Sequence, residues 1–228
     1  MTGLSRVMRD HPSLEYAAPF LVFVALLGGE RLVPLGPHLL YVLRVLLVSL
    51  VTLALSRRVI SLRISWFWQS AAVGVLVWAV WIGPDLLWPT YRHSWLFENS
   101  LTGTARSSLP ATLRAERFFL LVRLAGSSLL VPVIEELFWR SWLLRWLIDR
   151  QFWKIPLGTY TAASFWTVAV LFAGEHGPYW DVGLLAGIIY NWWMIRTRSL
   201  GDCILSHAVT NACLGAYVIL SGQWQYWL

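Results

Sequence analysis

The sequence predicts an all-α fold, a polytopic transmembrane helical bundle, and three observations support this prediction. Hydrophobic residues make up 57% of the 228 residues and charged residues only 13%, whereas a soluble domain carries about 25% charged residues. The apolar residues gather in runs of the length that crosses a bilayer. The 16 tryptophans fit a membrane protein whose indole rings lie at the level of the lipid headgroups.

Seven apolar runs are candidate spans, and a count of eight is also compatible with the sequence. In chain order they are Tyr16–Val33, Leu39–Leu55, Trp66–Gly83, Phe118 to about Leu147, Ala162–Gly174, Val182–Ile195 and Cys203–Leu220. The fifth and sixth are shorter than the ~20 residues that a span normally needs. We therefore expect them to extend into flanking residues or to be surrounded by the other helices.

The fourth run is too long for one straight crossing. It is either a tilted helix or a helix that bends at Pro132 and continues along the interface from Trp139 to Arg150. The tryptophans Trp139, Trp142 and Trp146 share one face of it. They indicate an aromatic belt at the interface or, less favoured, a lipid-facing groove for an acylated or prenylated substrate.

The basic residues between the runs predict the orientation. They precede the first run and follow the second, fourth and sixth, which are alternate ends of the helices: Arg6, Arg9, Arg57, Arg58, Arg63, Arg145, Arg150, Lys154, Arg196 and Arg198. The positive-inside rule places this side, and with it the N-terminus, in the cytoplasm of a bacterial inner membrane. The long loop Pro84–Arg117 is the exception, with Arg92, Arg106, Arg114 and Arg117 on the other side.

Several other classes of organisation are not indicated. The polar start of the chain and the lack of a small-residue cleavage site argue against a cleavable signal peptide. We find no internal repeat, so residues 1–228 form one integral-membrane domain. The net charge of +6 follows the positive-inside pattern and does not indicate a nucleic-acid partner. Cys203 and Cys213 lie ten residues apart, too far along one helix to form a disulfide.

Two adjacent acidic residues, Glu135 and Glu136, lie within the apolar fourth run. A carboxylate in a membrane costs about 2.5–3.5 kcal/mol on insertion scales, so such residues normally face the protein interior and have a function. Glu136 and Arg140 are four residues apart and can form an ion pair on one helix face. Glu135 is rotated by about 100° and has no local partner, which suits a general acid or base. Alternatively, both glutamates pair with arginines of other helices and only hold the bundle together.

Two histidines occupy similar surroundings. His176 lies at the end of the fifth run, where a histidine alone would more often be interfacial than functional. His207 and Asn211 are four residues apart, so both can point at one substrate group. They could form an oxyanion hole, or the histidine could bind a metal. The alternative is that they form interhelical hydrogen bonds.

Taken together, these motifs resemble a known family. Glu135-Glu136-Leu-Phe-Trp-Arg140, Phe172-Ala-Gly-Glu-His176 and His207-Ala-Val-Thr-Asn211 are similar to the three motifs of the CAAX-protease and bacteriocin-processing intramembrane proteases, and indicate a bacterial member. The resemblance covers a protease core of about residues 121–220. It implies a bundle of about eight spans around a polar intramembrane cavity.

The resemblance also implies an activity and residue roles. The chain would be an endopeptidase that cuts a membrane protein or a lipidated peptide within the lipid bilayer. Glu135 and His176 would activate the attacking water, and His207 with Asn211 would stabilise the oxyanion. Glu136, Arg140 and Phe172 would support the site.

The family has been described both as glutamate proteases and as zinc metalloproteases. Glu135, His176 and His207 are adequate zinc ligands, but no His-Glu-x-x-His motif is present. A mechanism without a metal uses every motif residue. We therefore favour no cofactor, with zinc held by these three residues as the alternative.

Two other functions would also place polar residues in a membrane. A proton-coupled transporter uses them as a relay, but it usually has an inverted repeat, and none is visible here. A non-catalytic or immunity-type scaffold would not need every motif residue, and all three motifs are intact. The sequence therefore favours a protease.

Overall fold

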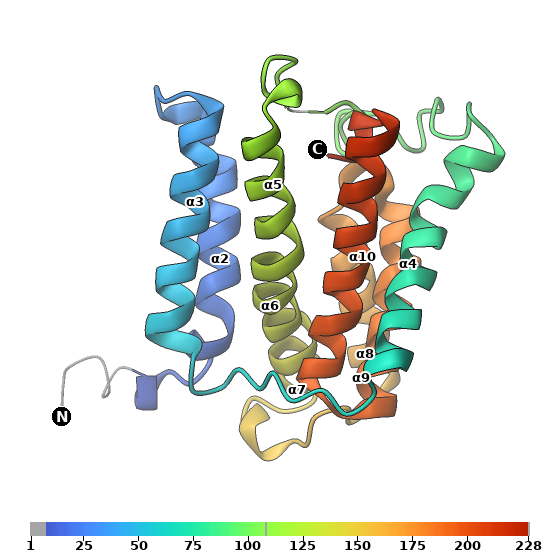
Figure 1. Cartoon of the computed structure of the whole chain (residues 1–228). Helices are drawn as coiled ribbons and strands as arrows, with labels where there is room; N and C mark the ends of the chain where they lie inside the picture. The colour runs from blue at the N-terminus through green and yellow to red at the C-terminus, as the bar shows by residue number, and fades with distance from the viewer. Residues whose placement is uncertain (1–7, 108, 228) are drawn as a thin grey trace.

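The computed structural model describes residues 8–107 and 109–227, and these residues form an all-helical bundle without a β-strand (Figure 1). Its helices are α2 (Leu14–Gly29), α3 (Pro37–Val51), α4 (Phe67–Leu87), α5 (Arg117–Ala125), α6 (Val131–Glu136), α7 (Leu144–Trp146), α8 (Ala162–Gly174), α9 (Trp180–Thr197) and α10 (Leu200–Ser221). Each of the seven apolar runs of the sequence corresponds to one rod of this bundle, and the all-α prediction is confirmed.

Four rods are long and apolar enough to cross a membrane: Pro37–Ser56, Phe67–Leu87, Arg117–Trp146 and Leu200–Ser221. The first is α3 extended by a π-helical turn, Thr52–Ser56. α2 and α8 are apolar but shorter. α8 packs against α9, and Asn191 of α9 joins them by donating to the Phe165 carbonyl over 2.9 Å. Short helices thus gain their stability inside the bundle from their neighbours.

The fourth rod runs without interruption from Arg117 to Trp146 (Figure 1). It consists of α5, α6 and α7 joined by two π-helical segments, Gly126–Leu130 and Leu137–Leu143. The helix is not interrupted at Pro132, where the π-helical segment just before the proline changes the hydrogen bonding at the missing N–H. The alternative of an interfacial continuation from Trp139 to Arg150 is wrong, since Trp139 is buried and the helix ends at Trp146.

The arginine-rich segments lie at one end of the bundle, as the sequence predicted (Figure 1). This end carries the start of α2, the segment between α3 and α4, the segment after α7 and the turn between α9 and α10. We call it the arginine-rich face. Arg6 lies outside the described residues. The opposite face carries the segment between α4 and α5 and the C-terminal segment Gly222–Trp227.

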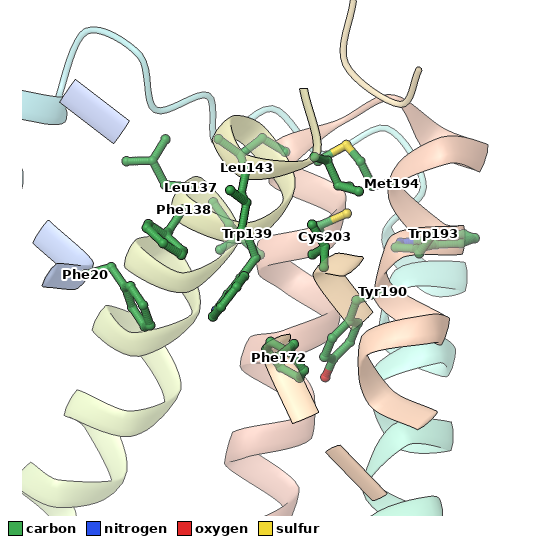
Figure 2. Packing of buried hydrophobic residues seen from close by; sticks show 14 of the residues in the cluster. Phe20, Leu137, Phe138, Trp139, Leu143, Phe172, Tyr190, Trp193, Met194 and Cys203 are labelled. Carbon is green, nitrogen blue, oxygen red and sulfur yellow. The ribbon is translucent and has the colours of Figure 1, made fainter. Parts of the chain in front are cut away.

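Two apolar clusters fill the bundle, one toward each face. The first joins the end of the fourth rod to α9 and α10 near the arginine-rich face, and Figure 2 shows Leu143, Met194 and Cys203 in it. Trp139 belongs to this cluster and packs on Phe138. Trp139 is therefore part of the core, whereas Trp142 and Trp146 are half-buried and pack against the same cluster. The second cluster includes Ile82, Phe119 and Val218 at the other face.

α4 and α10 approach each other closely at Gly74. The Thr210 hydroxyl of α10 donates to the Gly74 carbonyl over 2.8 Å. At the start of α10, Asp202 accepts from the Ser65 and Trp66 backbone N–H groups and from the Ser70 hydroxyl. These contacts fix the position of α10, which carries His207 and Asn211.

We predict that Gly74→Ala destabilises the bundle by about 1–3 kcal/mol, the usual cost of overpacking. A β-carbon at Gly74 would overlap the Ser206 carbonyl and lie 2.7 Å from the Val209 β-carbon, so α10 would have to move. Gly83→Ala on the same helix is the control, because nothing lies within 4 Å of a β-carbon there. Thermal unfolding in detergent measures both, and equal melting temperatures would contradict the close approach.

Candidate active site

A cavity of about 210 Å³ lies inside the bundle and brings together Glu135, His176, His207 and Asn211. These residues come from the fourth rod, the end of α8 and the middle of α10. The remaining lining residues are Val77, Trp81, Ser127, Val131, Phe172, Ala186, Tyr190, Thr210, Leu214, Tyr226 and Trp227. Polar groups that would be isolated in hydrocarbon therefore share one cavity, as membrane burial demands.

Glu136 is the centre of a buried charge network below this cavity. Its Oε1 accepts a hydrogen bond from Arg140 Nη1 at 3.1 Å, and both side chains are fully buried. The same oxygen lies 2.8 Å from His207 Nδ1. The pair with Arg140 follows from the four-residue spacing on one helix. The bond to His207 ties the fourth rod to α10 across 71 residues of sequence.

Arg140 is held by aromatic rings as well as by its carboxylate. Its guanidinium carbon lies 4.2 Å from the centre of the Phe172 ring and 5.2 Å from that of Tyr190. Cation–π contacts of this kind gain strength when they are desolvated. Phe172 thereby supports the charge network. This contact joins two motifs, because Phe172 is the first residue of the second motif and Arg140 is the last residue of the first motif.

Glu135 is in a different position from its neighbour. Its side chain lines the cavity, and its Oε2 atom has no hydrogen-bond partner among the described residues. The nearest ion partner is His207, whose Nε2 lies 4.0 Å from that oxygen. The Glu135 side chain as a whole is 10% exposed, whereas that of Glu136 is fully buried. Glu135 is thus the acid of the pair that can reach a small molecule.

His176 presents one nitrogen to the cavity. Its Nδ1 lies 2.7 Å from the Phe172 carbonyl, the residue one turn earlier. A carbonyl only accepts, so Nδ1 carries the proton in this bond and Nε2 has the lone pair. The Trp81 ring stands edge-on against the imidazole at 5.0 Å between centres. The interfacial alternative for His176 is wrong, because the residue lines the internal cavity.

His207 and Asn211 share a face of α10 and are both anchored. The His207 ring stacks on Tyr190 with centres 5.1 Å apart, and Tyr190 in turn donates to the Thr210 hydroxyl over 2.7 Å. Asn211 Nδ2 donates to the Ser127 carbonyl over 2.8 Å. That bond uses one amide hydrogen and leaves the second for another acceptor.

Sequence reasoning did not single out several residues that shape this cavity. Trp81 comes from the third span, whose only signal was hydrophobicity, and Tyr190 comes from the sixth. Tyr190 precedes Asn191 in the middle of an apolar helix. This polar pair is a signal that could have indicated which face of the helix points into the bundle. Tyr226 and Trp227 belong to the C-terminal segment and carry no motif.

The arrangement does not match a metal site. Among the described residues, no group of three His, Cys, Asp or Glu side chains could hold a metal ion. His207 Nδ1 and His176 Nδ1 are both engaged in hydrogen bonds, which leaves Nε2 as the free nitrogen of each ring. The set Glu135, His176 and His207 is not gathered into such a group among the described residues, and we derive no chemical step through a metal.

Comparison with known proteins agrees with the motifs. Residues 117–213 match the family described as Type II CAAX prenyl endopeptidase Rce1-like. This part of the chain is similar to the CAAX protease family. The match begins with the fourth rod and ends in α10, so it contains all three motifs and indicates an enzyme of the CAAX endopeptidase type. No curated protein and no solved structure matches the chain.

The CAAX-type site predicts a stability effect for its charge network. Glu136→Gln or Arg140→Ala should reduce stability by about 3–5 kcal/mol, because each change leaves the other partner as a buried, uncompensated charge. The double variant Glu136→Gln/Arg140→Gln removes both charges and should recover part of that loss. Expression level and thermal unfolding in detergent measure all three variants. Single variants that fold as well as the wild type would show that the pair does not hold the bundle together.

Proposed function

We propose that the chain is an intramembrane endopeptidase in which Glu135 and His176 activate water, while His207 and Asn211 stabilise the oxyanion. The observation that supports this proposal is the shared cavity, which is lined by the partly exposed Glu135 side chain and by His176. General-base catalysis requires a base within hydrogen-bond reach of the attacking water. A water in this cavity would lie beside both side chains.

In the first step, water bound between Glu135 and His176 attacks the carbonyl carbon of the scissile peptide bond. Glu135 takes the proton of this water, and the peptide carbonyl becomes a tetrahedral oxyanion. His176 positions the water through Nε2, because its Nδ1–H is already donated to the Phe172 carbonyl. The proton held by Glu135 then goes to the leaving amine, as a general acid supplies it, and the C–N bond breaks.

The oxyanion needs donors, and their supply depends on protonation. His207 donates Nδ1–H to Glu136, so its Nε2 can donate to an oxyanion only when the ring is an imidazolium. Asn211 contributes the amide hydrogen that it does not give to Ser127. Glu136 and Arg140 are positioning residues in this scheme, since they act through His207.

The substrate class follows from the surroundings of the site. The cavity lies among membrane-spanning helices, so the scissile bond belongs to a membrane-associated protein or peptide. Apolar residues such as Val77, Leu214 and Trp81 line it beside the polar groups. A peptide with a hydrophobic segment or an attached lipid fits these walls. A transporter or a non-catalytic scaffold would use the same fold but would release no cleaved product.

Glu135→Gln should slow cleavage of a membrane-tethered peptide by the purified full-length chain, because an amide cannot take the proton of water. The expected loss of rate is about 10²–10⁴-fold, the contribution usual for general-base catalysis. Glu116→Gln, an exposed residue at the start of the same rod, is the control and should cut at the wild-type rate. Equal cleavage by Glu135→Gln and Glu116→Gln would refute the proposed role. Cleavage by neither variant nor wild type would favour the scaffold or transporter.

Activity should survive exhaustive chelation, and Asn211→Ala should lower turnover by about 10²–10³ with little change in substrate binding, as the loss of an oxyanion donor does. The measurement is kcat and KM of peptide cleavage before and after chelation, together with metal analysis of active protein. A stoichiometric zinc that tracks activity, and that His207→Ala removes, would overturn the metal-free mechanism. The protease proposal would still stand.

A further inference from the structure

The catalytic cavity extends away from the arginine-rich face. Its lining includes Leu214, three residues beyond Asn211 toward the end of α10, and Trp81 near the end of α4. It also includes Tyr226 and Trp227 of the C-terminal segment. α4 and α10 both end at the face opposite the arginine-rich one (Figure 1). The cavity thus extends toward that opposite face.

On the side of the arginine-rich face, the apolar core blocks access to the cavity. Between the charge network and the arginine-rich face lie buried side chains of the first cluster, among them Leu137, Leu144, Met194 and Cys203. Figure 2 shows how Leu143, Met194 and Cys203 pack together beyond Trp139 and Tyr190. Close-packed interiors leave few voids larger than a water molecule. A peptide therefore has no path to Glu135 from the arginine-rich face in this structure.

A second, polar cavity adjoins the first at the open side. Its volume is about 490 Å³, and Tyr226 lines both cavities. Asp85, Arg92 and Glu98 supply its charged lining, with exposed His93 and Gln223 at its edge. Water and a peptide chain can be accommodated there directly beside the catalytic cavity.

An ion-pair network fixes the wall between the two cavities. Arg92 bonds Asp85 at 2.9 Å and Asp181 at 2.7 Å, and these pairs hold the loop after α4 against the start of α9. Tyr226 donates to Asp85 over 3.0 Å, and the Tyr179 hydroxyl donates to the Gln225 carbonyl over 3.2 Å. The C-terminal segment is thereby attached at the cavity mouth.

The charges of the two faces differ. At the arginine-rich face, the short connecting segments and the last turn of α9 contain several basic residues: Arg57, Arg58, Arg63, Arg150, Lys154, Arg196 and Arg198. These connecting segments also contain the acidic residue Asp149. The longer connection at the open side combines Arg92, Arg106 and Arg114 with Glu98 and Glu116. Short loops with excess basic residues stay in the cytoplasm. The charge pattern therefore places the open side of the cavity outside the cytoplasm.

We infer that substrate reaches Glu135 from the face opposite the arginine-rich loops, through the second cavity, and that the chain cuts a membrane-associated peptide presented on the non-cytoplasmic side. The statement about cutting rests on the proposed protease function, whereas the direction of entry does not. The second cavity is the subsite that receives the water-exposed part of the peptide, and its acidic groups favour a neutral or basic segment over an acidic one.

Thiol accessibility in the full-length chain tests the direction of entry. In a Cys203→Ala/Cys213→Ala background, Gln223→Cys marks the edge of the second cavity and Gln151→Cys marks the arginine-rich face. Both replace a neutral, exposed glutamine. Leu214→Cys places a thiol inside the catalytic cavity, and Ser127→Cys does so if the first variant fails to accumulate. Spheroplasts are treated with a small, charged, membrane-impermeant thiosulfonate before and after permeabilisation.

The expected result is that Gln223→Cys and Leu214→Cys react in sealed spheroplasts, while Gln151→Cys reacts only after permeabilisation. Reaction of Gln151→Cys alone in sealed spheroplasts would reverse the orientation and overturn the inference. A Leu214→Cys that stays unreactive, or that reacts only after permeabilisation while Gln223→Cys reacts before it, would disprove entry from this side. Labelling needs no turnover, so a failure of the protease proposal would appear separately, as absent peptide cleavage.

Discussion

The carboxylate of Glu136 is the interaction on which the rest of the site depends. One oxygen of this fully buried group meets Arg140 on its own helix and His207 on α10. A buried charge without partners costs several kcal/mol, so the fourth rod and α10 can pack here only in the register that brings all three groups together. Arg140 in turn contacts the rings of Phe172 and Tyr190, and through them α8 and α9. Four rods thus meet around one charge.

Much of this architecture could be predicted from the sequence, for reasons that are local. The length and spacing of apolar runs give the rods to within a few residues, and the four-residue spacing gives the Glu136–Arg140 pair. The bond between Glu136 and His207 could not be predicted, because it joins residues of different helices and depends on how these pack. The sequence left the course of the helix at Pro132 open for another reason: it shows the missing N–H but not the π-helical turn that precedes the proline.

The segment that matches the family does not contain all of the residues that line the cavity. The CAAX-type match covers residues 117–213 and includes every motif. Yet Val77 and Trp81 come from α4, and Tyr226 and Trp227 from the C-terminal segment. The groups that would carry out the chemistry therefore lie within the matched segment, while part of the wall that a substrate would touch lies outside it. Members of one such family can share a reaction and differ in what they accept, because these two sets of residues can vary independently.

The two π-helical segments of the fourth rod, Gly126–Leu130 and Leu137–Leu143, stand on either side of Glu135 and Glu136. A π-helical turn holds one more residue than an α-helical turn, so each segment is equivalent to a single-residue insertion in a regular helix. Removing one residue from the first segment would restore regular winding and turn Arg117–Ala125 by about 100° relative to the acidic pair. The rotation of one part of the helix relative to the other, and not only its composition, therefore determines that Glu135 faces the cavity while Phe119 faces the core. A length change of one residue is consequently a more severe alteration of this rod than most substitutions within it.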